Sequence, residues 1–369
     1  MVGGGRGGFI GAVHRMAAEL DGQAWVVAGA LSSDPGRARA SARDWYLQRA
    51  YDSYVEMAAA EAARPDGIDF VIVATPNHLH YPVSRAFLEA GIPVVCDKPL
   101  THTVEDAQRL VELVEARAVP FALTHNYSGY PAIREARRRV ADGFLGTLRK
   151  VMVEYSQGPA PRPAQAADGA SPNWRTDPAR AGIGGCVATI GTHAHHLLEF
   201  VAGQKVGSVY ADTTIFNPER GIEDDANLLL RLQGGAKGLL SCTKVATGEA
   251  NKLGIRLYGT RGGIEWQQED PGILVLKPAG EPWQRLQVGS GSACLSAQAR
   301  AATRLPAGHP EGYLESFAVL YREFIADLRR AARGEPPVGA YPAAAAGLAG
   351  MRFVRAAVES AAQDRWASV

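Results

Sequence analysis

The sequence is poor in several features that would assign it to particular classes of protein. Its four cysteines lie far apart without a C-x-x-C pair, which argues against a disulfide scaffold or a zinc site and fits a reducing cytoplasm. Neither sign of charge dominates, because 39 basic residues stand against 38 acidic ones, so nucleic acid is not an expected partner. No apolar run reaches the roughly 18 residues of a membrane helix, and the N-terminus lacks a signal-peptide core. We expect a cytoplasmic protein without membrane contact.

The first 125 residues contain alternating strand and helix signals. The run IDFVIVA at 68–74 is apolar throughout, as expected of a parallel strand that is covered on both faces. Helical patterns separate the strand signals, which lie at residues 25–30, 68–74, 93–96 and 120–124. This order predicts an α/β Rossmann domain with a doubly wound parallel sheet over residues 1–125.

The pattern changes after residue 125. Seven segments alternate polar and apolar residues, at 150–156, 207–216, 226–232, 238–245, 252–259, 263–268 and 273–278. Such alternation is typical of an antiparallel sheet with one buried face. Helical patterns accompany these segments at 130–142, 193–201, 313–332 and 343–363. We predict an α+β substrate-binding and oligomerisation domain over 126–369 with a large open, mostly antiparallel sheet, whose final helix is a candidate to pack back on the Rossmann domain.

The segment from Gly3 to Gly8 fits the dinucleotide-binding fingerprint G-x-G-x-x-G, with Gly3, Gly5 and Gly8 at its fixed positions. Glycines there let the backbone and a helix N-terminus approach a pyrophosphate. A structural turn is the alternative, because this segment is rich in glycine, but its place before a helix favours NAD(P) binding. Phe9 and Ile10 in the following helix complete this candidate set.

Only two residues precede that turn, whereas a strand usually has about five or six. Loss of most of a central strand would leave neighbouring backbone groups unpaired, at about 1–3 kcal/mol each. We expect that the natural chain begins upstream or that this strand pairs weakly.

The end of the second strand indicates which dinucleotide is bound. An NAD enzyme usually carries an acidic residue there for the adenine ribose. This chain has Ser32 and Ser33, with Arg37 one helical turn beyond, and hydroxyls with a guanidinium suit a 2′-phosphate. The cofactor expectation therefore leans toward NADP, although these residues could simply cap a helix and Asp34 could still reach a ribose.

Polar segments also follow the strands at 68–74 and 93–96, at the sheet edge where such domains bind ligands. After the first strand come Thr75 and Pro76, then Asn77 and His80, which are candidates to hydrogen-bond the nicotinamide ribose; a helix-capping turn is the alternative.

Asp97 and Lys98 follow the next strand. An amine at the end of a buried strand needs a polar partner, so Lys98 is a candidate to donate to a substrate hydroxyl or to relay its proton. The alternative is an ordinary surface lysine.

The segment GIGGCVATIGTHAHH at 182–196 leads from a glycine-rich turn into histidines on a helix. His193 is a natural base for an alcohol proton, and Thr189 shares its face if the helix begins near Cys186. No metal is expected, because His195 and His196 point away from His193 and no carboxylate completes a site.

Together these segments resemble the Gfo/Idh/MocA family of oxidoreductases over essentially the whole chain. The motifs that carry the resemblance are the glycine turn at 3–8, TPNHLH at 75–80, CDKPL at 96–100, NWR at 173–175, GTH at 191–193 and GHPEGY at 308–313.

The resemblance implies hydride transfer between a nicotinamide and a ring carbon that bears a secondary hydroxyl, with Lys98 and His193 as the catalytic pair flanking that carbon. It also implies a homodimer or homotetramer formed through the open sheet. Further substrate-binding candidates, each with packing or a surface contact as the alternative, are Tyr127, Trp174, Arg175, His309, Glu311 and Tyr313.

The chain departs from the family pattern at two positions. Asp97 replaces a glutamate, which is a mild change. Thr189 stands where relatives carry an aspartate, and the lost charge is worth about 1–2 kcal/mol in a hydrogen bond to substrate. We therefore expect a dehydrogenase or reductase of a sugar, glycoside or cyclic polyol. The alternatives are a redox-neutral enzyme with retained NAD(P), which eliminates, hydrolyses or epimerises through a keto sugar, and a non-catalytic dinucleotide-binding regulator.

Overall fold

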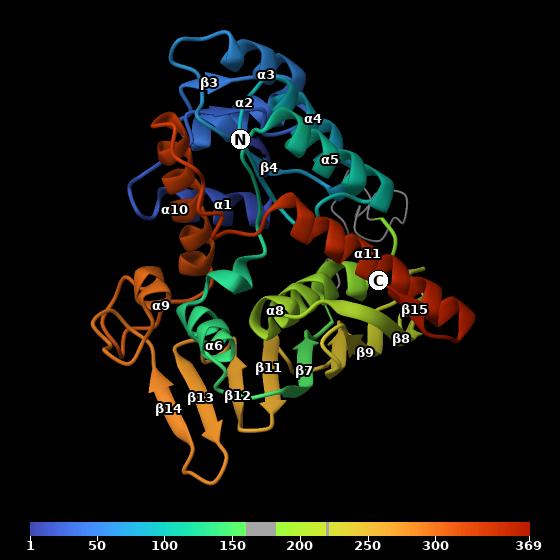
Figure 1. Cartoon of the computed structure of the whole chain (residues 1–369). Helices are drawn as coiled ribbons and strands as arrows, with labels where there is room; N and C mark the ends of the chain where they lie inside the picture. The colour runs from blue at the N-terminus through green and yellow to red at the C-terminus, as the bar shows by residue number, and fades with distance from the viewer. Residues whose placement is uncertain (160–181, 219–220) are drawn as a thin grey trace. The chain divides into compact units, whose positions relative to one another are not determined.

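The computed structural model describes residues 1–159, 182–218 and 221–369, which form two compact units (Figure 1). The first unit comprises residues 1–126 and 313–348, and the second comprises the described parts of 127–312 and 349–369. The first unit therefore includes helix α10 (Tyr313–Ala332) and the start of α11 (Ala344–Gln363), in addition to the segment that the strand-helix alternation marks.

The first unit is built on a parallel sheet. Strands pair in the order β1-β4-β5-β6, with bounds Val2–Gly3, Val71–Ala74, Val94–Cys96 and Phe121–Leu123. Two further strands, β2 (Ala28–Gly29) and β3 (Arg49–Ala50), pair with each other, and a parallel bridge from Ala30 to Val2 connects them to β1. The resulting order, β3-β2-β1-β4-β5-β6, confirms the expected doubly wound Rossmann fold.

Five helices follow the strands of this unit: α1 (Phe9–Glu19), α2 (Pro35–Asp44), α3 (Tyr54–Ala62), α4 (His80–Glu89) and α5 (Val104–Arg117). Side chains cap three of them, because Asp34, Ser53 and Thr103 accept amide protons at the starts of α2, α3 and α5. Neither β3 nor α3 is among the elements that the sequence patterns predict. The Ser-x-x-Glu pattern at 53–56 is the signal that could have marked the start of α3.

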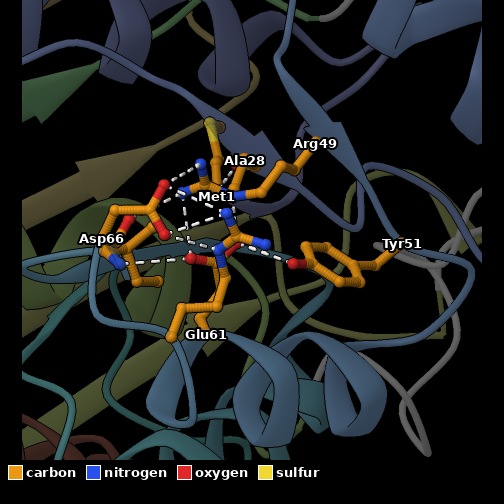
Figure 2. Close-up of polar contacts among 8 residues, drawn as sticks. Met1, Ala28, Arg49, Tyr51, Glu61 and Asp66 are labelled. Atoms are coloured by element: carbon orange, nitrogen blue, oxygen red, sulfur yellow. Dashed lines mark hydrogen bonds and ion pairs between the residues drawn. The ribbon is translucent and has the colours of Figure 1, made fainter.

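The chain start pairs with strands on both sides, although β1 has only two residues. Val2 and Gly3 pair with β4, the Gly3 amide donates to the Ala30 carbonyl (3.0 Å), and the Ala30 amide donates to the Met1 carbonyl (3.0 Å). The Met1 amine donates to the Ala28 carbonyl at 2.7 Å (Figure 2). Burial lowers the pKa of this amine to about 5, although the nearby Glu61 carboxylate acts in the opposite direction.

A buried carboxylate joins β3 to α3 beside that amine. Glu61 accepts hydrogen bonds from the Arg49 guanidinium (2.7 and 3.0 Å) and the Tyr51 hydroxyl (2.8 Å) (Figure 2). It also accepts from the Ile68 amide (3.2 Å). Burial alone would raise the pKa of Glu61, but the hydrogen bonds from Arg49 and Tyr51 outweigh it and hold this pKa below its usual value.

The second unit contains a nine-stranded sheet in the order β14-β13-β12-β11-β7-β10-β9-β8-β15. Neighbouring strands are antiparallel except β7 and β10, which confirms the expected mostly antiparallel sheet. The strands are β7 (Leu148–Ser156), β8 (Val206–Thr214), β9 (Asp225–Leu232), β10 (Lys237–Thr243), β11 (Lys252–Gly259), β12 (Gly262–Gln267), β13 (Ile273–Pro278), β14 (Gln284–Gln287) and β15 (Ala367–Ser368).

Helices α6 (Pro131–Ala141) and α8 (Thr192–Ala202) lie on one face of this sheet (Figure 1). Along β9 and β10, every second residue is buried and the residues between them are partly or fully exposed, so one face is packed and the other is open. A short helix, α9 (Ala297–Ala302), and strand β14 lie in segments for which the sequence patterns predict neither a helix nor a strand. Both are too short to produce a periodic signal.

All four cysteines are free. Cys186 and Cys242 are buried with their Sγ atoms 3.9 Å apart, and a hydrogen bond between them together with burial raises the pKa of Cys186. Cys294, in contrast, is exposed. Within the described ranges, no helix has the length and apolar character to cross a membrane, and no group of side chains has the composition of a metal site.

Candidate active site

The glycine turn between β1 and α1 has room only for glycine at several positions. Gly3 and Gly4 have φ of +74° and +72°, and a Cβ on Gly5 would lie 2.6 Å from the Ser41 hydroxyl oxygen. Gly11, which the fingerprint does not include, is equally constrained, because its Cβ would lie 2.1 Å from the Gly4 carbonyl oxygen. The turn is thus held tightly against α1.

Helix α1 begins after Gly8 without a side-chain cap, unlike α2, α3 and α5. Its first amides are therefore not satisfied by a capping side chain, and the backbone around them is compact enough for a pyrophosphate to approach. Phe9 at this helix start is 73% exposed, whereas Ile10 packs against the buried core of the unit. The local geometry fits a dinucleotide.

At the end of β2, Asp34 is engaged in capping α2. Its carboxylate accepts from the Arg37 amide (2.6 Å), and the Ser32 hydroxyl accepts from the Asp34 amide (3.1 Å). Ser33 and the Arg37 residue are exposed. After β2, the chain therefore presents the hydroxyls of Ser32 and Ser33 and the guanidinium of Arg37, whereas the Asp34 carboxylate is bound to a backbone amide.

At the end of β4, the His80 ring contacts backbone on both sides. Its Nδ1 lies 2.7 Å from the Pro99 carbonyl oxygen and its Nε2 lies 3.0 Å from the Thr75 carbonyl oxygen. Burial lowers the pKa of His80. The ring thus connects the segment after β4 to the segment after β5, while Asn77 is buried nearby and Pro76 is half-buried.

The Asp97 carboxylate at the end of β5 is part of a buried cluster that the sequence did not indicate. Asp97 accepts from the Thr124 hydroxyl (3.1 Å) and lies 3.7 Å from His14 Nε2, while His14 Nδ1 lies 2.6 Å from the Tyr321 hydroxyl. Burial would raise the pKa of Asp97, but His14 and then Lys98 lower it well below its usual range. Lys98 follows directly and is half-buried.

In the second unit, His193 lies in the first turn of α8, directly after a wider helical turn at Val187–Gly191. The Thr189 hydroxyl in this turn donates to the Gly185 carbonyl (2.8 Å). A carboxylate that the sequence did not indicate, Glu223, accepts from the amides of Gly185 and Val187 at the start of the same turn. Burial raises the pKa of Glu223 despite these bonds.

Aromatic rings surround His193. The Tyr127 ring lies edge to face with the imidazole, with centroids 4.9 Å apart, and the Tyr155 ring lies at 6.4 Å. The two tyrosine hydroxyls are 2.6 Å apart, and both bond to Asn251. Tyr155 and Asn251 were not among the predicted residues, because neither belongs to a recognisable motif.

The remaining predicted substrate residues lie in different surroundings. Glu311 accepts from the amides of Arg304 and Leu305 (2.7 and 2.8 Å), and His309 is exposed with Nδ1 3.3 Å from the Pro306 carbonyl oxygen. Tyr313 begins α10, and its ring lies 5.2 Å from that of Phe317. Trp174 and Arg175 lie outside the described residues.

The two histidines after His193 have separate partners. His195 Nε2 lies 3.3 Å from the Glu199 carboxylate, and its ring stacks on Phe353 at 4.3 Å. His196 stacks on Phe200, and burial lowers its pKa to about 3.

Comparison with known proteins gives a consistent result over both units. Residues 1–125 match the model of the "Oxidoreductase family, NAD-binding Rossmann fold", and residues 133–265 match that of the "GFO/IDH/MocA C-terminal domain". The chain is 32% identical to the "Uncharacterized oxidoreductase YfiI" of Bacillus subtilis, a match that covers 98% of this chain and 94% of that protein.

Two solved structures are similar to the whole chain. An oxidoreductase from Sinorhizobium meliloti is 42% identical with a TM-score of 0.88, covering 99% of this chain and 98% of that one. An inositol dehydrogenase homolog from Azotobacter vinelandii, complexed with NADH and myo-inositol, is 36% identical with a TM-score of 0.90, covering 100% of this chain and 96% of that one.

Proposed function

The chain belongs to the GFO/IDH/MocA family of NAD-binding oxidoreductases, and on this basis we propose that it transfers a hydride between the nicotinamide of NAD(P) and the carbon of a secondary hydroxyl in a sugar, glycoside or cyclic polyol. The observation that carries this proposal is the half-buried Lys98 directly after β5 of a sheet whose glycine turn fits a dinucleotide. An inositol dehydrogenase homolog among the similar structures supports the substrate class.

The residues of the first unit would hold the dinucleotide. The glycine turn and the first amides of α1 would bind the pyrophosphate, and Asn77 would bind the nicotinamide ribose. When bound, the nicotinamide supplies or accepts the hydride. We assign to His80 the role of fixing the backbone around Lys98, because both of its ring nitrogens face carbonyl oxygens.

Two side chains of this protein would move the proton. His193 would take the hydroxyl proton as the hydride leaves the carbon, because imidazole is a suitable base near neutral pH. Lys98 would donate a hydrogen bond to the same oxygen or relay its proton. Thr189 would bind a substrate hydroxyl through its own oxygen, since its proton is donated to the Gly185 carbonyl.

We further propose that the cofactor is NADP. The hydroxyls of Ser32 and Ser33 and the exposed Arg37 suit a 2′-phosphate, and the neighbouring carboxylate of Asp34 is bound to an amide. Ser32→Asp should shift the ratio of kcat/KM for NADP over NAD toward NAD by roughly tenfold, because a carboxylate repels the phosphate. An unchanged ratio would remove this assignment.

The open face of the nine-stranded sheet is the proposed contact of a homodimer or homotetramer. Leu229 on β9 is 50% exposed there and pairs with Leu239 on β10. Leu229→Lys should shift the mass measured by light scattering toward the monomer, whereas Leu305→Lys, at another exposed leucine, should not.

The activity is tested by following reduced nicotinamide with purified protein, NADP or NAD, and a panel of sugars and polyols. Lys98→Ala and His193→Ala should each lower kcat by a factor of roughly 100 or more while cofactor affinity stays nearly unchanged. Unaltered turnover in both variants would refute the mechanism.

Thr189 in place of the family aspartate favours a second candidate, a redox-neutral enzyme that retains its cofactor. Chromatography of the products distinguishes it, because sugar would be consumed without net reduction of the nicotinamide. If neither nicotinamide reduction nor a sugar product is detected, the remaining candidate is a non-catalytic dinucleotide-binding regulator.

A further inference from the structure

Three side chains of the second unit form a closed hydrogen-bonded ring beside His193. The Tyr127 and Tyr155 hydroxyl oxygens are 2.6 Å apart, the Tyr155 oxygen lies 3.0 Å from Asn251 Oδ1, and Asn251 Nδ2 lies 3.3 Å from the Tyr127 oxygen. The three residues come from separate segments, namely the start of the unit, β7, and the residue before β11.

The chemistry of the donors sets the direction of every bond in this ring. A carboxamide oxygen only accepts, so the Tyr155 proton is given to Asn251 Oδ1. The proton between the two hydroxyls must then come from Tyr127, and the Tyr127 oxygen accepts from Asn251 Nδ2. All three bonds therefore run the same way around the ring, an arrangement in which each bond polarises the next.

The amide of Asn251 is held in one orientation by two neighbours outside the ring. Gln157 Nε2 donates to Asn251 Oδ1 (2.6 Å), and Asn251 Nδ2 lies 3.4 Å from Gln268 Oε1. A rotation that exchanges Oδ1 and Nδ2 would reverse the direction of the ring, and it would place the amide donor against Gln157 Nε2 and the amide oxygen against Gln268 Oε1. These two neighbours therefore favour the direction described above.

The ring fixes the aromatic plane that the His193 imidazole contacts. Tyr127 is 2% exposed, and its ring meets that of His193 at an interplanar angle of 86° with centroids 4.9 Å apart. Rotation of the Tyr127 side chain would break two hydrogen bonds, so the edge-to-face contact cannot shift without cost. This contact restrains the plane of the His193 imidazole.

We propose that Tyr127, Tyr155 and Asn251 are positioning residues that hold the His193 imidazole in one orientation for proton transfer. This inference rests on the proposed function for its catalytic consequence. It gives Tyr127 a different role from the one that the family resemblance suggests, because its hydroxyl is bonded within the ring and its aromatic face supports the base. Asn251 belongs to no recognisable motif, yet under this proposal it determines the rate of turnover.

The kinetic test compares variants that open the ring at two points. Tyr127→Phe keeps the aromatic ring and removes the hydroxyl, and Asn251→Ala removes the amide. Each should lower kcat roughly tenfold to hundredfold with KM within about twofold, because the base is misplaced while sugar binding persists. The double variant should be no slower than the slower single variant, since both changes open the same ring.

The matched control is Tyr210→Phe, which removes a hydroxyl bonded to Asp364. Tyr210 lies on β8, which strands β10 and β9 separate from β7 in the sheet. This variant should keep kcat within about twofold of the wild type. A raised KM at unchanged kcat in Tyr127→Phe would make Tyr127 a substrate contact and overturn the proposal, as would additive losses in the double variant or unaltered kinetics.

A measurement without activity separates this inference from the proposed function. In protein labelled at histidine, Asn251→Ala keeps both tyrosine side chains but removes their bonds to position 251, so Tyr127 is free to rotate. The ring-proton shifts of His193, assigned with His193→Gln, should then move as the imidazole reorients. They should stay unchanged in Tyr210→Phe. Unmoved His193 shifts in Asn251→Ala would overturn the proposal even if the wild type is an active dehydrogenase, and moved shifts would support it even if no substrate is turned over.

Discussion

The strand ends of the first unit and the surroundings of His193 in the second unit fix polar side chains in different ways. In the first unit, the two ring nitrogens of His80 lie 2.7 and 3.0 Å from the backbone carbonyl oxygens of Pro99 and Thr75, both within 20 residues of it in the sequence. In the second unit, the side chains at positions 127, 155 and 251 lie beside His193 and are hydrogen-bonded to one another. Because the partners of His80 are backbone atoms, we expect changes in the first region to affect folding. Because the partners around His193 are side chains, we expect changes in the second region to leave the protein folded.

This difference predicts that substitutions in the first region reduce stability or cofactor binding, and that those in the second change turnover in a folded protein.

The largest effect should come from Glu61→Ala in the first unit. This change leaves the Arg49 guanidinium and the Tyr51 hydroxyl without their carboxylate, and breaking a buried ion pair costs about 3–5 kcal/mol. Urea unfolding at neutral pH measures the loss. Asp66→Ala, which removes an exposed partner of Arg64, is the control and should cost at most about 1 kcal/mol.

The lowered pKa of Glu61 also predicts how the stability of the protein depends on pH. Because its pKa is lowered in the folded state, its contribution is present above the unfolded pKa of about 4.3 and is lost as the pH falls toward the folded pKa. The stability difference between wild type and Glu61→Ala should therefore shrink on acidification. A difference that grows in acid would contradict this account of the cluster.

The next effect should come from Gly11→Ala. The added Cβ would lie 2.1 Å from the Gly4 carbonyl oxygen, so the turn and α1 must separate, and the affinity for NAD(P)H should fall roughly tenfold or more. Fluorescence titration measures it. The matched control is Gly350→Ala in α11, where an added Cβ has no atom within 4 Å, and equal affinities in the two variants would argue against a cofactor role for the turn.

The smallest effect should come from Thr189→Asp in the second unit. A carboxylate gains a charged hydrogen bond to substrate but loses the donation to the Gly185 carbonyl, so turnover of inositol-like substrates should rise by at most about tenfold. Thr189→Ser keeps the hydroxyl and should stay near the wild type. A fall in turnover with Asp would mean that Thr189 is adapted to a different substrate.

Much of the fold could be predicted from local patterns. The alternation over 252–259 and 273–278 gives the bounds of β11 and β13, and the apolar pattern at 313–332 gives those of α10. The alternation of polar and apolar residues could not predict β3 or β14, because strands of two to four residues are too short to show a period.

The residues of the candidate site likewise divide into those that the sequence could identify and those that it could not. Lys98 and His193 stand in contiguous motifs, so the sequence could identify them. Tyr155, Asn251 and Glu223 could not be found, because each reaches its partner through pairing of distant segments, and nothing in its immediate sequence distinguishes it from an ordinary strand or loop residue.

The distribution of thiols has a practical consequence for these experiments. Of the four cysteines, three are buried, and the proton affinity of Cys186 is raised so that little thiolate forms at neutral pH. Cys294 alone is exposed. A maleimide dye should therefore attach to the unaltered protein at this single position, giving a fluorescent reporter in the second unit without any engineered residue.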